Sequence, residues 1–326
     1  MKTRLAAFLI LLSFVLPPVA AAAEGGPVFG LRAVGNPKRG YFVYKIAPGA
    51  AQSGAVIVSN TGNRTGTVKL FSADGSTGQT TGTVYLTDSK PVHAGAWVKL
   101  AQPSVRLAPG EIKRVPFTVR VPPSHVGPGQ WVAGIVAETG TSAKTKRSTR
   151  KAGVQIRIRN QTIIAVQVNV PGPLSSAFTI GGVKTGGQRG FQQVLVHFSN
   201  DGNTLLKPTG SVTVLQGGKT IEHLPFKMDT FLPQTAIDYP VLLKKALAAG
   251  EYQTKVLLSY PTPAGGRKTI AASPTLKISD ENVKQVFTSA APQQPPGGVV
   301  ADSGSSTPWV LIGGIVALVL LLLLAI

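Results

Sequence analysis

The sequence predicts an all-β protein built from two tandem antiparallel β-sandwiches. Three observations favour this class: apolar residues alternate with polar ones along most of the chain, clusters of Pro and Gly separate the alternating runs, and one turn motif occurs twice. In "IKRVPFTVRV", every second residue from Val115 to Val121 is apolar, so one face of a strand is expected to be buried. The run "VLVHF" from Val194 has the same pattern. The one candidate helix is "VLLKKALAA" from Val241.

The repeated turn motif reads "SNTGN" in its first copy and "SNDGN" in its second. Each copy stands between two alternating runs, which is the pattern of a strand, a turn and a strand. Asn60 and Asn200 are expected to bond their own backbone as Asx-turns, and Gly62 and Gly202 to provide positive φ angles. The motif is therefore predicted to be architectural.

A second internal similarity supports two related domains. "LAPGEIKRVPFTVRV" from Leu107 and "FLPQTAIDYPVLL" from Phe231 both begin with a proline turn and continue as a strand that contains a second proline. Downstream of each, a Gly-x-Trp or Gly-x-Tyr opens another strand. The sequence predicts two immunoglobulin-like antiparallel β-sandwiches, at residues 26–170 and 171–280, with the break at "NVPGP".

Both ends of the chain are expected to lie outside these domains. Residues 1–23 have the pattern of a signal peptide, with Lys2 and Arg4 before an apolar run and small residues after it. An uncleaved anchor is the alternative. Residues 309–326, "WVLIGGIVALVLLLLLAI", are apolar throughout and would reach about 27 Å as a helix, enough for a bilayer core. The sequence predicts a single C-terminal transmembrane helix there.

The segment between body and span, residues 281–308, is rich in Pro, Gly, Ser and Gln and is predicted to be a flexible linker that acts as a stalk. A signal peptide joined to a C-terminal span leaves the bulk of the chain outside the cytoplasm. We therefore expect a single-pass protein of the cell membrane. The chain has no cysteine, so its stability must come from burial rather than from disulfides.

The motifs "YFVYKIAPG", "VIVSNTGNRTGTVKLFSAD", "GQWVAGIVAE" and "GVQIRIRNQTIIAVQVNVPG" occur in this order. In this order they resemble the peptidoglycan-binding domain of the WxL-interacting proteins of Gram-positive bacterial surfaces. The later run "VLVHFSNDGNTLLKPTGSVTVLQGGKTI" is similar to the second sandwich of that family, which binds a host or partner. The resemblance implies attachment to the cell wall through residues 26–170 and contact with a surface partner through residues 171–280.

Enzymatic chemistry is not indicated by the sequence. The four histidines, His93, His125, His197 and His223, lie singly, and none is at metal-ligand spacing from another. There is no cysteine nucleophile, G-x-S-x-G elbow, P-loop or Rossmann glycine pattern. His125 is expected to be a loop residue. We predict a protein that is not an enzyme and uses no cofactor or metal; an active site assembled from distant residues is the alternative.

The charge is strongly positive, with 33 Lys and Arg against 13 Asp and Glu, and no acidic residue occurs from Thr139 to Asn200. Within that stretch, "AKTKRSTRK" is expected to form a basic hairpin tip. The residues predicted to contact an anionic polymer are Lys144, Lys146, Arg147, Arg150 and Lys151. The alternative is a solvated loop. Nucleic acid is disfavoured by export and by the lack of interleaved aromatic residues.

The function predicted from these features is that of a non-enzymatic, membrane-anchored cell-surface protein. Its expected partners are peptidoglycan or anionic wall polymers, a further surface protein, and the membrane itself through the C-terminal helix. The alternative function is that of a paired-sandwich chaperone or assembly factor for exported surface proteins, because chaperones of that kind also consist of two sandwiches.

Overall fold

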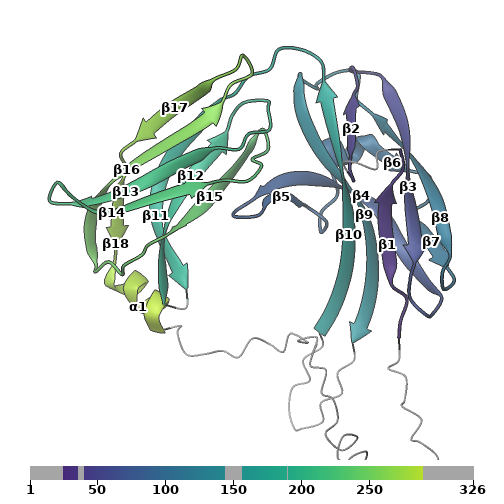
Figure 1. Cartoon of the computed structure of the whole chain (residues 1–326), viewed down its shortest axis with the longest axis horizontal. Coiled ribbons are helices and arrows are strands. Elements are labelled where there is room, and N and C mark those ends of the chain that lie inside the picture. The colour runs from purple at the N-terminus through teal and green to yellow at the C-terminus, as the bar shows by residue number, and fades with distance from the viewer. Residues whose placement is uncertain (1–24, 36–39, 144–155, 189, 289–326) are drawn as a thin grey trace, which may run out of the picture.

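The computed structural model describes residues 25–35, 40–143, 156–188 and 190–288. These residues form two β-sandwiches joined at one end, so the all-β prediction is confirmed for them (Figure 1). The predicted signal peptide (1–23), most of the predicted linker (281–308) and the predicted transmembrane helix (309–326) lie outside the described residues. Within the described part, no helix is both long enough and apolar enough to cross a membrane.

The first sandwich packs a four-stranded sheet against a six-stranded sheet. The four-stranded sheet has the order β1 (Phe29–Ala33), β3 (Ala51–Asn60), β8 (Ile112–Arg120) and β6 (Val98–Leu100). The six-stranded sheet has the order β2 (Phe42–Lys45), β10 (Ile156–Val170), β9 (Gly129–Ala143), β4 (Gly66–Gly78) and β5 (Gly82–Tyr85), with β7 (Ser104–Leu107) also paired to β4. A short 3₁₀ helix, η1 (Ala94–Trp97), precedes β6. All neighbours are antiparallel except β2 and β10, which are parallel.

The second sandwich packs a three-stranded sheet against a five-stranded sheet. The three-stranded sheet has the order β11 (Phe178–Gln188), β12 (Phe191–Asn200) and β15 (Thr235–Leu242). The five-stranded sheet has the order β14 (Lys219–Lys227), β13 (Thr209–Gln216), β16 (Gly250–Pro261) and β17 (Arg267–Ala272), with β18 (Thr275–Ile278) also paired to β16. The chain then forms the α-helix α1 (Asp280–Thr288).

Each sandwich has its own hydrophobic core. The alternation expected from Val115 to Val121 is confirmed, since the four apolar side chains are buried in the first core, and Val194, Val196 and Phe198 are buried in the second. The two cores share no residue. Burial of separate apolar clusters is what makes a domain, so the chain contains two structural units.

The Asn60 turn (residues 60–64) ties three distant segments of the first sandwich together. The buried Asn60 amide accepts from the backbone N–H groups of Val28 at 3.2 Å and Gly62 at 3.0 Å. It donates to the carbonyl oxygens of Arg64 at 2.8 Å and Leu107 at 3.2 Å. The Asx-turn prediction is therefore confirmed, and the same side chain also fixes the first strand and the proline turn.

The Asn200 turn (residues 200–204) repeats this arrangement in the second sandwich. Asn200 is fully buried, accepts from Gly202 N at 3.2 Å, and donates to the carbonyl oxygens of Thr204 at 2.9 Å and Phe231 at 3.4 Å. In both copies the backbone carbonyl oxygen of this asparagine also accepts a hydrogen bond, from the backbone N–H of the fourth residue of the proline turn. The donors are Gly110 N at 2.8 Å and Gln234 N at 2.7 Å, and both donor residues have positive φ, 75° and 55°. The internal repeat thus extends to individual hydrogen bonds.

The expected reason for Gly62 and Gly202 was wrong. Neither has a positive φ angle. A Cβ atom at Gly62 would lie closer than 3.0 Å to the carbonyl oxygen of Gly26, and one at Gly202 would lie equally close to the carbonyl oxygen of Ser175. Close approach of the segment that leads into each sandwich, rather than backbone conformation, therefore requires glycine at both positions.

Two further expectations differ from the structure. The candidate helix from Val241 is absent: β15 continues to Leu242, and the next residue, Leu243, is buried in the second core and bonds Gln192 O through its N–H at 3.0 Å. Conversely, α1 begins at Asp280, so it covers the first residues of the predicted linker. Val283 packs on the second core and Val286 is buried, which holds the helix against the second sandwich. The mutual bonds between Ser279 and Asn282 cap its first turn.

Candidate functional site: the edge of β10 and the joint between the sandwiches

Strand β10 has one edge along which most residues are not paired with another strand. All of its fifteen residues, from Ile156 to Val170, are in continuous register with β9. On its other side, β2 pairs only with residues 166–169. Residues 156–165 therefore have no paired strand on that side among the described residues. Unpaired N–H and C=O groups along an edge can accept an additional strand.

The long edges of the second sandwich carry features that discourage strand addition. Edge strand β14 contains Pro225, and edge strand β15 contains Pro240. A proline on an edge strand removes one outward donor. Edge strand β11 has a register break between Ile180 and Val183, and such bulges twist an edge away from a partner.

The other edge strands of the first sandwich are three to five residues long. By contrast, the open part of β10, "IRIRNQTIIA", has neither proline nor glycine nor register break. Short edges are a common protection against unwanted pairing. β10 is therefore the longest described edge that has none of these features; β17 (Arg267–Ala272) is also without them but is only six residues long.

The open edge is held firmly by the sandwich behind it. Ile164, near the C-terminal end of the open part, is buried in the first core, as are Val166 and Val168 in the part that β2 covers. On the opposite face, Tyr85 of β5 lies close to Gly134 and Ile163, and burial raises the pKa of Tyr85 to about 12, so its hydroxyl stays neutral. A fixed, well-packed edge loses little conformational freedom when a further strand is added.

Arg159 lies near the N-terminal end of the open edge, where its side chain is half exposed. The Arg159 guanidinium forms an ion pair with Asp88 at 2.6 Å and lies 3.7 Å from Glu138. The hydrogen bond and charge of Asp88 raise the pKa of Arg159. Gln161 donates to Glu138 at 2.7 Å. These polar groups face the same side of the sheet as Tyr85.

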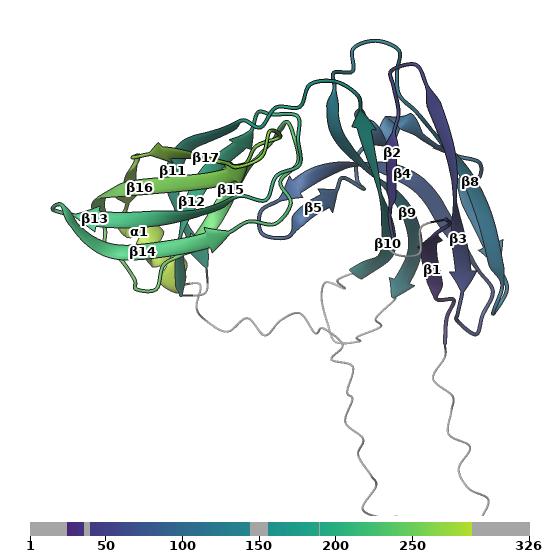
Figure 2. The same cartoon turned by 45° about the horizontal axis from the view of Figure 1, so that its top comes forward.

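The two sandwiches meet at a joint built from buried groups. The buried Thr77 of β4 accepts from Leu232 N at 2.9 Å through its hydroxyl oxygen, which lies 2.6 Å from the hydroxyl of Thr235. Gln130 of β9 donates from its N–H to Asn203 O at 2.8 Å and accepts from Leu205 N at 2.7 Å through its side chain. The β4–β5 hairpin reaches toward the second sandwich in both views (Figures 1 and 2).

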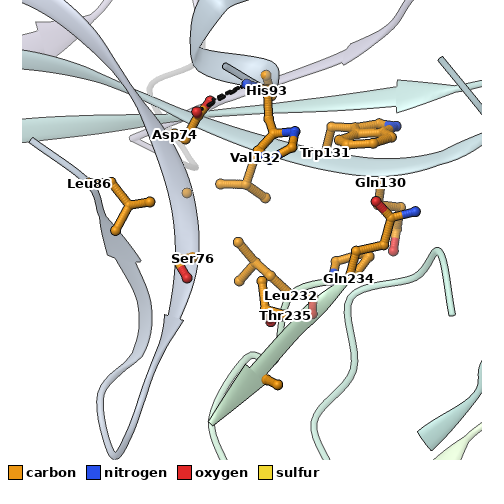
Figure 3. Close-up of a pocket in the computed structure, with 14 residues that line it drawn as sticks. Asp74, Ser76, Leu86, His93, Gln130, Trp131, Val132, Leu232, Gln234 and Thr235 are labelled. Atoms are coloured by element: carbon orange, nitrogen blue, oxygen red, sulfur yellow. Dashed lines mark hydrogen bonds between the residues drawn. The ribbon is translucent and has the colours of Figure 1, made fainter. Parts of the chain in front are cut away.

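A cavity of about 260 Å³ lies at this joint. Figure 3 shows Trp131 and Gln130 on one side, Leu86 on the other, and Leu232 of the second sandwich facing Val132. The Asp74 carboxylate lies at one end and accepts from the backbone N–H groups of Val92, His93 and Gly95 at 2.7–3.2 Å. It therefore positions η1. None of the described lining residues is Lys or Arg, so the cavity offers no Lys or Arg side chain to bind an anion.

The residues predicted to contact an anionic polymer cannot be placed. Lys144, Lys146, Arg147, Arg150 and Lys151 lie outside the described residues. What the structure does show is that β9 ends at Ala143 and β10 begins at Ile156, and that these two residues are paired. The basic segment therefore joins two antiparallel strands and directly precedes the open edge. Its contact with an anionic polymer stays a prediction.

The histidines have separate surroundings. His125 lies in the loop between β8 and β9 with φ 64°, as expected. His93 stacks on Trp131 with ring centroids 6.5 Å apart, His197 bonds Asp238 at 2.8 Å, and His223 bonds Thr213 at 3.0 Å. In the described part of the chain, no three His, Asp or Glu side chains come together as a metal site would require.

Comparison with known proteins gives structural similarities only. No family model matches the chain, and no curated protein matches it. The resemblance to WxL-interacting proteins therefore stays an expectation. Among solved structures, the YadV chaperone is 13% identical, with a TM-score of 0.35 and coverage of 75% of this chain and 98% of that one.

Two other solved structures have similar values. A chaperone–tip adhesin complex of CFA/I fimbriae biogenesis is 10% identical, with a TM-score of 0.35 over 76% of this chain and 98% of that one. The Escherichia coli chaperone DraB is 16% identical, with a TM-score of 0.31 over 76% and 97%. Because these TM-scores are below 0.5, nothing about the function of this chain follows from them.

Proposed function

We propose that this chain is a non-enzymatic binding protein that takes up an extended segment of another exported protein at the open edge of β10. It would then act as an assembly factor or docking partner for that protein. The observation that carries the proposal is the unequal coverage of β10, which is paired along its whole length on one side and only at residues 166–169 on the other. Strand addition to such an edge is a recurring way to bind a peptide.

The contrast with the other edges supports this function. If β10 served only the fold, the proline and bulge features of β11, β14 and β15 would be expected on it as well. The joint supports it too, because the hydrogen bonds of Thr77 and Gln130 fix the second sandwich to the sheet that contains β10. The second sandwich could then contact the same partner.

Attachment to peptidoglycan or an anionic wall polymer remains a separate proposal. It rests on the basic segment at residues 144–151 and on the resemblance described above. The placement in the cell membrane likewise rests on the sequence of residues 1–23 and 309–326. Protease treatment of intact cells tests that placement, because it should digest residues 26–280 and leave a short membrane-bound remnant.

The edge proposal is tested by site-specific photo-crosslinking in the native cell. A photoreactive phenylalanine analogue at the exposed Thr162 of β10 should crosslink to an extended segment with alternating apolar residues. The matched control carries the analogue at the exposed Thr220 of edge strand β14. The crosslinked segment, made as a peptide, should then slow amide hydrogen exchange of residues 158–165 by more than about tenfold.

Two results would overturn the proposal. One is equal crosslinking of the same proteins to Thr162 and Thr220. The other is a peptide that binds the protein and protects a sheet face or another edge while leaving the exchange of residues 158–165 unchanged.

A further inference from the structure

The outer face of the four-stranded sheet in the first sandwich carries a set of unpaired cations. Residues alternate in direction along a strand, and the residues next to these cations in sequence are buried or packed on the core, so the cations point outward. All four side chains are exposed and none is in an ion pair with a described residue. They are Arg32 of β1, Lys99 of β6, and Arg114 and Arg120 of β8.

No acidic residue offsets this charge within the sheet. The strands β1, β3, β6 and β8 contain neither Asp nor Glu. Some cations of the second sandwich do have acidic partners, such as Lys277 with Glu251 at 2.8 Å and Lys207 with Asp229 at 3.3 Å. The face is therefore a local concentration of positive potential on the first sandwich.

The cations are regularly placed. Ile57 of β3 is paired on one side with Arg32 and on the other with Arg114, so these two arginines are two strand spacings apart, about 10 Å. Arg114 and Arg120 are separated by six residues of one strand, about 20 Å. Lys99 is paired with Thr118, between the two arginines of β8. The charges thus form a band across and along the sheet.

A hollow lies in the middle of this band. It has a volume of about 290 Å³ and is lined by Ser53, Lys99, Pro116 and Thr118, with Leu100, Ala101 and Phe117. Ser53 and Thr118 are paired across β3 and β8, so the two hydroxyls and the ammonium group come from adjacent strands of the same face. Hydroxyl and ammonium donors with guanidinium groups nearby are suited to phosphate oxygens.

We propose that this face, with Arg32, Lys99, Arg114 and Arg120, binds a phosphodiester-linked anionic polymer. Successive phosphates of such a chain would follow the band of cations, with one phosphate in the hollow beside Lys99. The proposal is independent of the open edge of β10. β3 and β8 lie on the side of the first sandwich that faces away from the second (Figure 1), so both surfaces can be occupied together.

A polymer fits this face better than a lipid bilayer does. Surfaces that dock on membranes combine cations with exposed aromatic or large apolar side chains that enter the headgroup region. Among the exposed large apolar residues of the described chain, Ile112 alone belongs to these four strands.

Binding of the full chain, held in a neutral detergent, to poly(glycerol phosphate) tests the proposal. The variant R32Q/K99Q/R114Q/R120Q should bind about 100-fold more weakly at about 50 mM salt, and the slope of log K against log salt should fall by about 3. The control removes the same number of charges from exposed lysines of the second sandwich, as K219Q/K227Q/K255Q/K268Q, and should keep most of the affinity. Circular dichroism should show both variants folded.

Four outcomes decide the matter. Loss of polymer binding only in the first variant supports the proposal. An equal loss in both variants would mean that net charge alone binds the polymer, and would overturn it. Equal affinity for polyglutamate would show that phosphate is not recognised, and binding to vesicles of phosphatidylglycerol and phosphatidylcholine but not to poly(glycerol phosphate) would identify a membrane surface instead. Each of these last two results would also reject the polymer.

Discussion

The two sandwiches share their internal bonds and differ at their edges. Asn60 and Asn200 bond their own turn and the proline turn in the same way, the proline turns repeat, and Gly129 and Gly250 open β9 and β16 with positive φ angles of 142° and 157°. The long edges of the second sandwich, however, are protected by prolines and a bulge, whereas β10 of the first is open over residues 156–165. The bonds that build each fold are common to both copies, and the surfaces available for binding are particular to one.

Alanine at the two motif asparagines is expected to give the largest losses of stability. Asn60→Ala leaves Val28 N, Gly62 N and two carbonyl groups without their side-chain partner, so we expect a loss of about 4 kcal/mol in the free energy of unfolding. Asn200→Ala breaks fewer bonds and should cost about 3 kcal/mol. Hydrogen exchange in increasing urea measures each sandwich separately. Equal weakening of both sandwiches by one substitution would contradict the separation of the cores.

Alanine at the motif glycines should have the next largest effect. Gly62→Ala and Gly202→Ala place a methyl group against backbone atoms, and each should cost about 2–3 kcal/mol. Gly127→Ala is the matched control, because nothing lies within 4 Å of a Cβ at Gly127 and its φ is not positive. Thermal unfolding compares the three variants. If Gly62→Ala is as stable as Gly127→Ala, close approach is not the reason for the glycine.

A smaller effect is expected at the joint. Thr77→Val removes the acceptor of Leu232 N in a buried site and should weaken the contact between the sandwiches by about 1–2 kcal/mol. Thr83→Val changes the residue paired with Thr77 on β5 and serves as the control. Small-angle scattering should show a wider range of angles between the sandwiches for Thr77→Val only. An unchanged scattering profile would mean that the other bonds across the joint, those of Gln130 and Asn203, fix it without Thr77.

The smallest effects, of opposite sign, are expected for two buried tyrosines of β16. The Tyr260 hydroxyl is buried without a hydrogen-bond partner among the described residues, so Tyr260→Phe should raise the free energy of unfolding by up to about 1 kcal/mol. Tyr252 donates to Ala248 O at 3.0 Å, and Tyr252→Phe should lower it by about 1 kcal/mol. Urea midpoints at constant slope measure both. A loss of stability in Tyr260→Phe would reveal a partner for its hydroxyl.

Period-two patterning was sufficient to predict an all-β protein, because each strand carries its own pattern. The hydrogen bonds of the motif asparagines were not predictable from the sequence, because Asn60 bonds Val28 and Leu107, which are 32 and 47 residues away along the chain. The open edge of β10 could not be predicted either, since it depends on how far the distant strand β2 extends. A partial signal was present, namely a long alternating run without Pro or Gly.

The helix errors have a physical cause as well. "VLLKKALAA" contains good helix formers, but Leu243 and Val241 are buried in the second core, and tertiary packing there outweighs propensity. Helix α1 was not predicted, because the sequence that follows it is rich in Pro, Gly, Ser and Gln and resembles a linker. A signal for this helix was nevertheless present in the sequence. Ser279 can cap a helix that begins with Asp280 and Glu281, and it bonds Asn282 at the third helical position. Val283 and Val286 then lie on one side of the helix.

The parallel pairing of β2 with β10 determines how the first sandwich responds to mechanical force. Phe42 to Lys45 run alongside Val166 to Asn169 in the same direction, and β10 leads into the second sandwich. A pull between the N-terminal part of the chain and the second sandwich therefore drives the two strands past each other along their length. All four residue pairs then bear the load at once, instead of opening one after another from an end. If the N-terminal end is held while the second sandwich is pulled, β1 must first separate from β3, and the short parallel ladder then bears the load.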